Sequence, residues 1–174
     1  MRFSIRVALG ALATALLAAP AAADTPTLLG VYKDWQAFTS GSGSAKICYA
    51  ISKPTSTEPK KVKRDPVYFL ITDWPGRRAK AEPEIVPGYQ YKDGSTVTGQ
   101  VGSGTFEFFT KNDGGNGAAW VRERADEIKL IDAMKAGQNI VVIGTSKRGT
   151  HTTDTYSLAG LSDALDKIHA TCGM

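Results

Sequence analysis

The sequence predicts a mainly β fold: an antiparallel sandwich or barrel-like domain with a short internal helix and a C-terminal helix packed on the sheet. Three observations carry this prediction. Apolar and polar residues alternate with a period of two through most of the chain, which is typical of strands with one buried face. Glycine-rich turns separate these segments. Helical apolar spacing is confined to two segments, 125–137 and 157–172.

The N-terminus has the composition of a secretory signal peptide. Arg2 and Arg6 precede an apolar run over residues 7–19, and Ala21-Ala22-Ala23 offers the small residues that a signal peptidase needs. We expect residues 1–23 to be removed by cleavage between Ala23 and Asp24, which leaves a single domain over residues 24–174. Export to the periplasm, secretion or peripheral association with the outer membrane would follow, with no transmembrane segment after signal removal.

The charge balance argues against a nucleic-acid-binding protein. The formal net charge of the whole chain is +4, and two of these charges come from arginines of the expected signal peptide. The remaining basic excess is too small for the electrostatic footprint that nucleic acids require.

Seven to nine strands are expected. Residues 65–74 form a β-branched and aromatic run typical of a central strand buried on both faces, whereas Pro87 and Gly88 suit an edge strand or a bulge at 84–91. In order, the candidate strands are 31–39, 46–52, 65–74, 84–91, 95–102, 105–111, 118–121, 139–146 and 150–158.

Each of the two helical segments has an apolar stripe and one residue that marks an end of the helix. In the first, Ile128, Ile131 and Met134 recur at helical spacing, and Gly137 is a favourable C-terminal stop. In the second, Ser157 is a natural N-cap. Its apolar stripe consists of Leu158, Leu161, Leu165, Ile168 and Cys172.

The basic segment Lys53–Asp65 interrupts the strands and contains five Lys or Arg residues. Its prolines and charges oppose packing, so a solvated, mobile loop is favoured over an arm that binds acidic surfaces or lipid head groups.

The candidate catalytic groups do not form a recognisable constellation. Residues 147–149 form a hairpin turn in which Gly149 needs a left-handed conformation, and His151 then lies on the opposite strand face from Asp154. A hydrolase using His151 with Ser157 or Tyr156 remains one alternative. A metal site would have to use His151 and His169, and we expect neither a metal nor another cofactor.

Aromatic residues suggest a second alternative, a glycan- or lipid-binding module. Such residues are more often part of a core, and Phe106 and Phe108 share a face with core spacing while Phe109 lies opposite. The aromatic candidates are Tyr68, Phe69, Trp74, Tyr89, Tyr91, Phe106, Phe108 and Phe109.

Two cysteines, Cys48 and Cys172, remain in the exported chain. An even count in an oxidising compartment predicts one disulfide bond. Cys172 ends the apolar stripe of the last helix, and Cys48 has small neighbours on its strand face, so the bond would hold that helix to the sheet.

Three segments resemble the invasion-associated locus B family of exported bacterial proteins: "DWQAF" with "KICYAIS", "RDPVYFLIT", and the C-terminal block from Ile131 to Cys172. The resemblance implies an exported, mainly β domain without established enzymatic activity. The sequence thus favours a non-catalytic envelope protein that acts by protein–protein interaction with envelope proteins or host surface components, with a link to invasion implied by the family.

Overall fold

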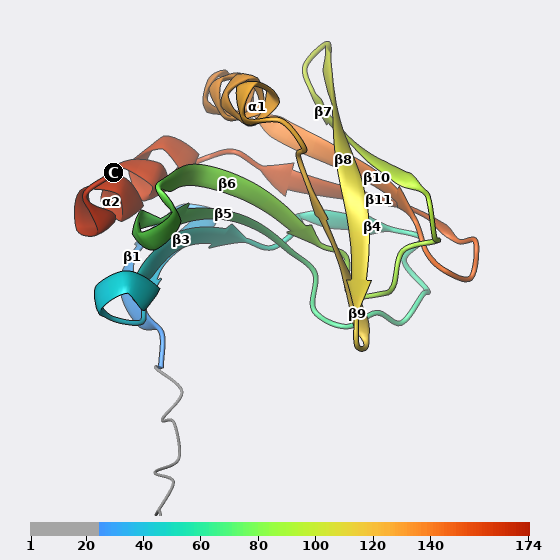
Figure 1. The fold of residues 1–174 in the computed structure, drawn as a ribbon. Helices are drawn as coiled ribbons and strands as arrows, with labels where there is room; N and C mark the ends of the chain where they lie inside the picture. Colours follow the sequence, from blue (N-terminus) through green and yellow to red (C-terminus); the bar gives the residue numbers. More distant parts are fainter. Residues whose placement is uncertain (1–24) are drawn as a thin grey trace, which may run out of the picture.

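The computed structural model describes residues 25–174, so the expected signal peptide and the cleavage between Ala23 and Asp24 lie outside the described residues. Eleven strands form one antiparallel sheet, and two α-helices pack against it (Figure 1). The strands are β1 (Thr27–Tyr32), β2 (Trp35–Ser40), β3 (Ile47–Ser52), β4 (Ser56–Glu58), β5 (Tyr68–Trp74), β6 (Ala79–Val86), β7 (Thr96–Val101), β8 (Gly104–Asp113), β9 (Asn116–Trp120), β10 (Asn139–Thr145) and β11 (His151–Ser157). The helices are α1 (Arg124–Ala136) and α2 (Leu161–Cys172), with two short 3-10 helices at Gly43–Ala45 and Pro75–Arg77.

The strand order is β1-β2-β3-β5-β6-β9-β8-β7-β10-β11-β4. The sheet curls strongly, but β1 and β4 stand at its two ends, so the curl does not close into a barrel (Figure 1). The mainly β, antiparallel class and the packed C-terminal helix are confirmed, whereas the expected number of strands was too low. Part of the difference lies at Lys33, whose φ of 52° turns the chain between β1 and β2 where one strand was expected.

The second additional strand, β4, lies inside the basic segment that was expected to be a mobile loop. Strands β3 and β5 pair directly with each other, yet the chain between them runs to the far end of the sheet, where Thr57 pairs with Asp154 of β11. Thr55 strengthens this contact, because its backbone N–H and its hydroxyl both donate to the carbonyl of Thr155, at 2.7 and 3.0 Å. The interpretation of this segment as solvated throughout was therefore wrong.

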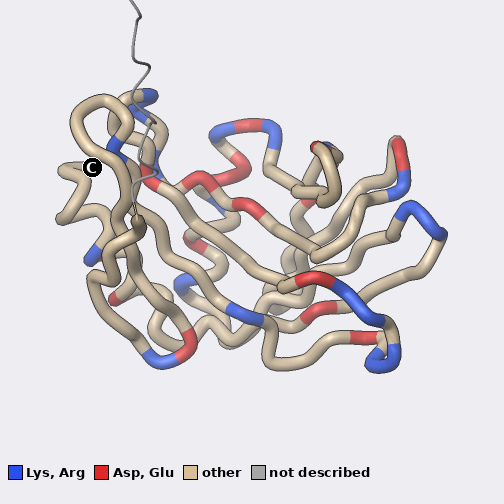
Figure 2. The backbone as a smooth tube through the Cα atoms, turned by 90° about the horizontal axis from the view of Figure 1, so that it is seen from below, with Lys and Arg blue, Asp and Glu red and all other residues tan. Residues whose placement is uncertain are grey.

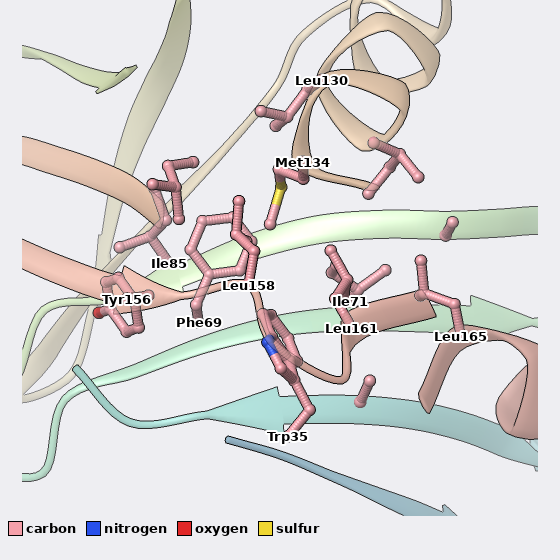
Figure 3. Packing of buried hydrophobic residues seen from close by; sticks show 14 of the residues in the cluster. Trp35, Phe69, Ile71, Ile85, Leu130, Met134, Tyr156, Leu158, Leu161 and Leu165 are labelled. Atoms are coloured by element: carbon pink, nitrogen blue, oxygen red, sulfur yellow. The ribbon is translucent and has the colours of Figure 1, made fainter. Parts of the chain in front are cut away.

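The core lies on the concave side of the sheet and is closed by both helices (Figure 3). Phe69 of β5 is at its centre: its ring meets those of Trp35, Tyr156 and Phe108 edge to face, at centroid distances of 6.2, 5.6 and 6.4 Å. Each large side chain buried here contributes roughly 1.5–3 kcal/mol of transfer free energy. The helices add Leu130, Met134, Leu161 and Leu165, all fully buried.

Two expectations about individual strands were wrong. Leu70 and Tyr68 of β5 are only half-buried, so the strand is not buried along its full length on both faces. Strand β6 is an interior strand between β5 and β9 rather than an edge, and Pro87 and Gly88 follow its end.

Helix α1 forms where helical spacing predicted it, but its buried side differs from the expected one. Ile131 and Met134 are buried as predicted, whereas the side chain of Ile128 is 48% exposed and Leu130 is buried instead. The helix is rotated so that its contact with the core starts at Leu130, two residues later than the pattern indicated.

Helix α2 begins at Leu161, four residues after the predicted cap, because Ser157 still belongs to β11. The chain turns at Gly160, which has a φ of 87° and lies so close to β1 that an added Cβ would come within 2.0 Å of the Tyr32 carbonyl oxygen. Leu161, Leu165 and Ile168 are buried as predicted.

Three contacts hold the C-terminal part of α2 to the sheet. The structure contains the expected disulfide bond between Cys48 of β3 and Cys172, with sulfur atoms 2.10 Å and α-carbons 6.0 Å apart. His169 Nδ1 hydrogen-bonds the buried Asp73 carboxylate at 2.7 Å, and Lys46 Nζ donates to the Thr171 carbonyl at 2.6 Å.

Candidate functional site

A groove of about 740 Å³ opens between the end of the basic segment and the β10–β11 turn. We call it the basic groove. Both loops lie at the same end of the molecule and carry Lys and Arg (blue in Figure 2). The groove is lined by Val62, Lys63, Arg64, Asp65, Gly88, Tyr89, Gln90, Gly115, Ser146, Lys147, Arg148, Thr150 and Thr152.

A buried ion pair fixes one wall of the groove. The Arg64 guanidinium donates two hydrogen bonds to the Asp154 carboxylate, at 2.9 and 2.5 Å, and the two side chains are only 7% and 3% exposed. Arg64 also lies over the Tyr89 ring, 5.7 Å from its centroid. The hydrogen bond to Asp154 raises the pKa of Arg64 above its ordinary value. This bidentate pair locks the basic segment onto β11.

Tyrosines surround the ion pair. The Tyr89 hydroxyl shares a hydrogen bond of 2.6 Å with the Thr152 hydroxyl. The Tyr156 hydroxyl is buried without a hydrogen-bond partner in the described part of the chain, and it points away from the hydrophobic cluster in Figure 3. Burial raises the pKa of Tyr89 and, further, of Tyr156. These phenols therefore stay protonated at neutral pH and are poorly suited to act as nucleophiles.

The rim of the groove carries cations that no carboxylate neutralises. Lys63, Lys147 and Arg148 are exposed, and none of them forms an ion pair within residues 25–174. Lys147 Nζ donates only to the neutral amide oxygen of Gln90, at 3.4 Å. Among the residues that line the groove, Asp65 is the one that carries a carboxylate. The groove is consequently suited to negatively charged partners.

The sequence profile described as "Invasion associated locus B (IalB) protein" matches residues 35–169. The chain belongs to the IalB family. A crystal structure of invasion associated protein B from Bartonella henselae is similar to this chain with a TM-score of 0.58, over 83% of this chain and 98% of that chain. At 14% sequence identity this likeness shows the IalB fold alone. No curated protein matches the chain.

In this IalB fold, the candidate hydrolase residues do not come together. His151 is exposed, and its Nδ1 hydrogen-bonds the Thr145 hydroxyl at 3.2 Å. Asp154 and Tyr156 lie on the opposite, buried face of β11, as the alternation predicted for Asp154. The Ser157 hydroxyl accepts a hydrogen bond from the Ala159 backbone N–H at 3.2 Å.

The two histidines do not meet either. His169 is bonded to Asp73 beside the disulfide, whereas His151 lines a separate hollow of about 290 Å³. Within residues 25–174, no group of three or more His, Cys, Asp or Glu side chains is placed to hold a metal ion.

The aromatic candidates divide between the core and the outer face of the sheet. Phe69 and Phe108 are fully buried, and Phe106 packs against the same core. Phe109 lies on the outer face beside its cross-strand neighbour Trp120, which was not among the candidates, with ring centroids 5.9 Å apart. They line a shallow hollow of about 350 Å³ together with charged side chains. The aromatic residues therefore do not form one continuous platform.

Sequence reasoning included Tyr89 only among the aromatic candidates and Arg64 only as one residue of the basic segment, and it did not pair Arg64 with Asp154. One signal was available: Asp154 shares its strand face with Thr152 and the apolar body of Tyr156, and an acid on a buried face requires a cation or several donors. The basic segment, the one concentrated source of cations in the sequence, was the natural place to look for that partner.

Proposed function

We propose that this IalB-family protein is an exported, non-catalytic binding protein of the cell envelope, and that it acts through non-covalent contact with acidic envelope proteins or host surface components. The basic groove is its contact surface. The observation that carries this proposal is that two loops about 85 residues apart in the sequence line the same groove, and that each bears cations without an ion-pair partner. The Arg64–Asp154 ion pair fixes one of these loops in place.

The rival functions have weaker support from the geometry. A hydrolase would need a nucleophile and a base within hydrogen-bonding reach of each other. Tyr156 points to the opposite face of β11 from His151, and Ser157, on the same face, lies six residues further along the strand, about 20 Å away. A glycan-binding module would use Phe109 and Trp120, but Arg122 already covers the Phe109 ring, with its guanidinium carbon 4.8 Å from the centroid.

Export is tested by fractionation of cells that express the full chain, followed by N-terminal sequencing of the recovered protein. We expect the mature chain in the periplasm or the medium, starting at Asp24. A chain that keeps Met1 and stays in the cytoplasm contradicts the proposed location.

The contact surface is tested by photo-crosslinking in the same cells. A photoreactive amino acid replaces Arg148 in the groove, and a control variant carries it at the exposed Lys167 on α2. We expect discrete adducts from position 148, lost when Lys147 is also replaced by glutamate, and no matching adducts from position 167. Equal adducts from both positions, or none from either, would refute the assignment of the groove as the contact surface.

A further inference from the structure

The charge of the basic groove limits the chemistry of what it can bind. Lys63, Lys147 and Arg148 approach it from two loops, and the single unpaired carboxylate in the lining belongs to Asp65. A ligand that fills the groove must therefore bring more than one negative charge if the cations are to be neutralised when they lose water.

Both walls are ordered before any ligand arrives. On one side, Arg64 is fixed by Asp154, and the backbone N–H of Asp65 donates to the Gly88 carbonyl at 3.0 Å, which places the neighbouring Lys63. On the other side, the β10–β11 turn is closed by hydrogen bonds from Ser146 N to the Thr150 carbonyl at 2.9 Å and from Gly149 N to the Ser146 carbonyl at 2.8 Å. Little conformational entropy of the backbone remains to be lost on binding.

The donors of the groove match a tetrahedral oxyanion. Each lysine ammonium offers three donors and Arg148 offers five, while the Ser146 hydroxyl accepts from Thr150 N at 3.1 Å and so keeps its own hydrogen to donate. One planar carboxylate carries a single charge and satisfies a single guanidinium. A phosphate ester presents several acceptor oxygens in different directions and can be shared between cations on opposite walls.

From these observations, and resting on the proposed function, we propose that the basic groove binds phosphate groups, carried by an anionic lipid headgroup or by a soluble phosphate ester. A volume of about 740 Å³ accommodates a headgroup-sized molecule. The side chain of Val62, 44% exposed between Lys61 and Lys63, would lie against the acyl boundary when the phosphate belongs to a lipid.

The test uses the mature protein and three probes: inorganic pyrophosphate, citrate as a carboxylate anion of similar charge, and vesicles of phosphatidylcholine with or without phosphatidylglycerol. Calorimetry measures the soluble probes, and co-sedimentation measures the vesicles. The variant Lys147→Gln/Arg148→Gln removes two groove cations. Its matched control, Lys135→Gln/Lys167→Gln, removes two exposed cations on the helices. Thermal unfolding verifies that both variants remain folded.

We expect the wild type to bind pyrophosphate, phosphatidylglycerol vesicles or both, with weaker binding at higher salt. Loss of the two groove cations should weaken vesicle binding about 30-fold, whereas the control variant should change it by less than about 3-fold. Binding of vesicles alone assigns the phosphate to a lipid, binding of pyrophosphate alone assigns it to a soluble ester, and binding of both shows that the groove accepts phosphate from either source.

Three results would overturn the inference: no binding of either phosphate probe, an equal loss in both double variants, or binding of citrate as tight as that of pyrophosphate. If photo-crosslinking at position 148 still captures a partner under these outcomes, the proposed function stands and the phosphate assignment alone falls.

Discussion

The buried ion pair between Arg64 and Asp154 makes a quantitative prediction about stability. Replacing Arg64 by methionine leaves the Asp154 carboxylate without its cation in a site where it is 3% exposed. Removing one partner of a buried pair costs about 3–5 kcal/mol of unfolding free energy. For a chain of this size, 3 kcal/mol corresponds to a fall of roughly 6–12 °C in melting temperature.

The chain offers an internal control for this measurement. Lys129 and Asp126 form an ion pair of similar length, 2.9 Å, but their side chains are 70% and 52% exposed. Lys129→Gln should therefore cost at most about 0.5 kcal/mol. Urea denaturation of the oxidised protein measures both variants. Because Arg64→Met removes the ion pair that holds the basic segment against β11, this variant should also be cleaved faster by trypsin after Lys60, Lys61 and Lys63.

The double variant Arg64→Met/Asp154→Leu separates the pair's own contribution from the cost of an orphaned charge. We expect it to recover most of the stability that Arg64→Met loses, because two apolar side chains leave no buried charge without a partner. If Arg64→Met loses no more than Lys129→Gln does, the site is hydrated in solution and the argument for a fixed groove wall is wrong.

Three further predictions concern other parts of the fold. Cys48→Ser should lower the free energy of unfolding by about 2–5 kcal/mol in urea denaturation. An unfolding free energy equal to that of the oxidised wild type would contradict the conclusion that the disulfide stabilises the packing of α2 on the sheet. Gly160→Ala should destabilise the protein by more than about 1 kcal/mol, because both its φ of 87° and the Tyr32 carbonyl oppose a Cβ; an unchanged melting temperature would show that the turn relaxes. Burial raises the pKa of Tyr89 and Tyr156 in the folded state, so their contribution to stability is fully present below about pH 10 and is lost as the pH rises through the folded values. Absorbance at 295 nm should show phenolate formation coinciding with alkaline unfolding, and complete tyrosine ionisation in folded protein would refute this.

Local patterns predicted those features of the fold that depend on local chemistry. Alternation identified β2, β3, β8, β10 and β11, a β-branched and aromatic run identified β5, and the stripe of Leu161, Leu165 and Ile168 predicted the buried side of α2. The left-handed Gly149, with a φ of 85°, follows from the short turn in the same way. Each of these predictions needed only residues within one turn or one strand.

The candidate site could not be predicted in this way because it is non-local. Composition correctly described Lys53–Asp65 as charged and rich in proline, but whether Ser56–Glu58 pairs with a strand depends on β11, about 97 residues later. The same holds for Arg64, whose burial is decided by Asp154. Ile128 shows that a helical pattern predicts the helix but not which of its sides is buried. Its spacing is helical, yet the orientation of α1 against the sheet leaves it exposed.

The long excursion that carries β4 away from β3 and returns the chain to β5 also bears on the order of folding. Contacts between β4 and β11 close a loop of about 97 residues, and contacts of such high sequence separation form late because the chain must first lose the entropy of that loop. The β3–β5 part of the sheet can therefore assemble while Lys63 and Arg64 are still unrestrained. The basic groove is therefore complete only when the β10–β11 hairpin has docked, and any binding through it, as proposed above, must wait for this C-terminal step.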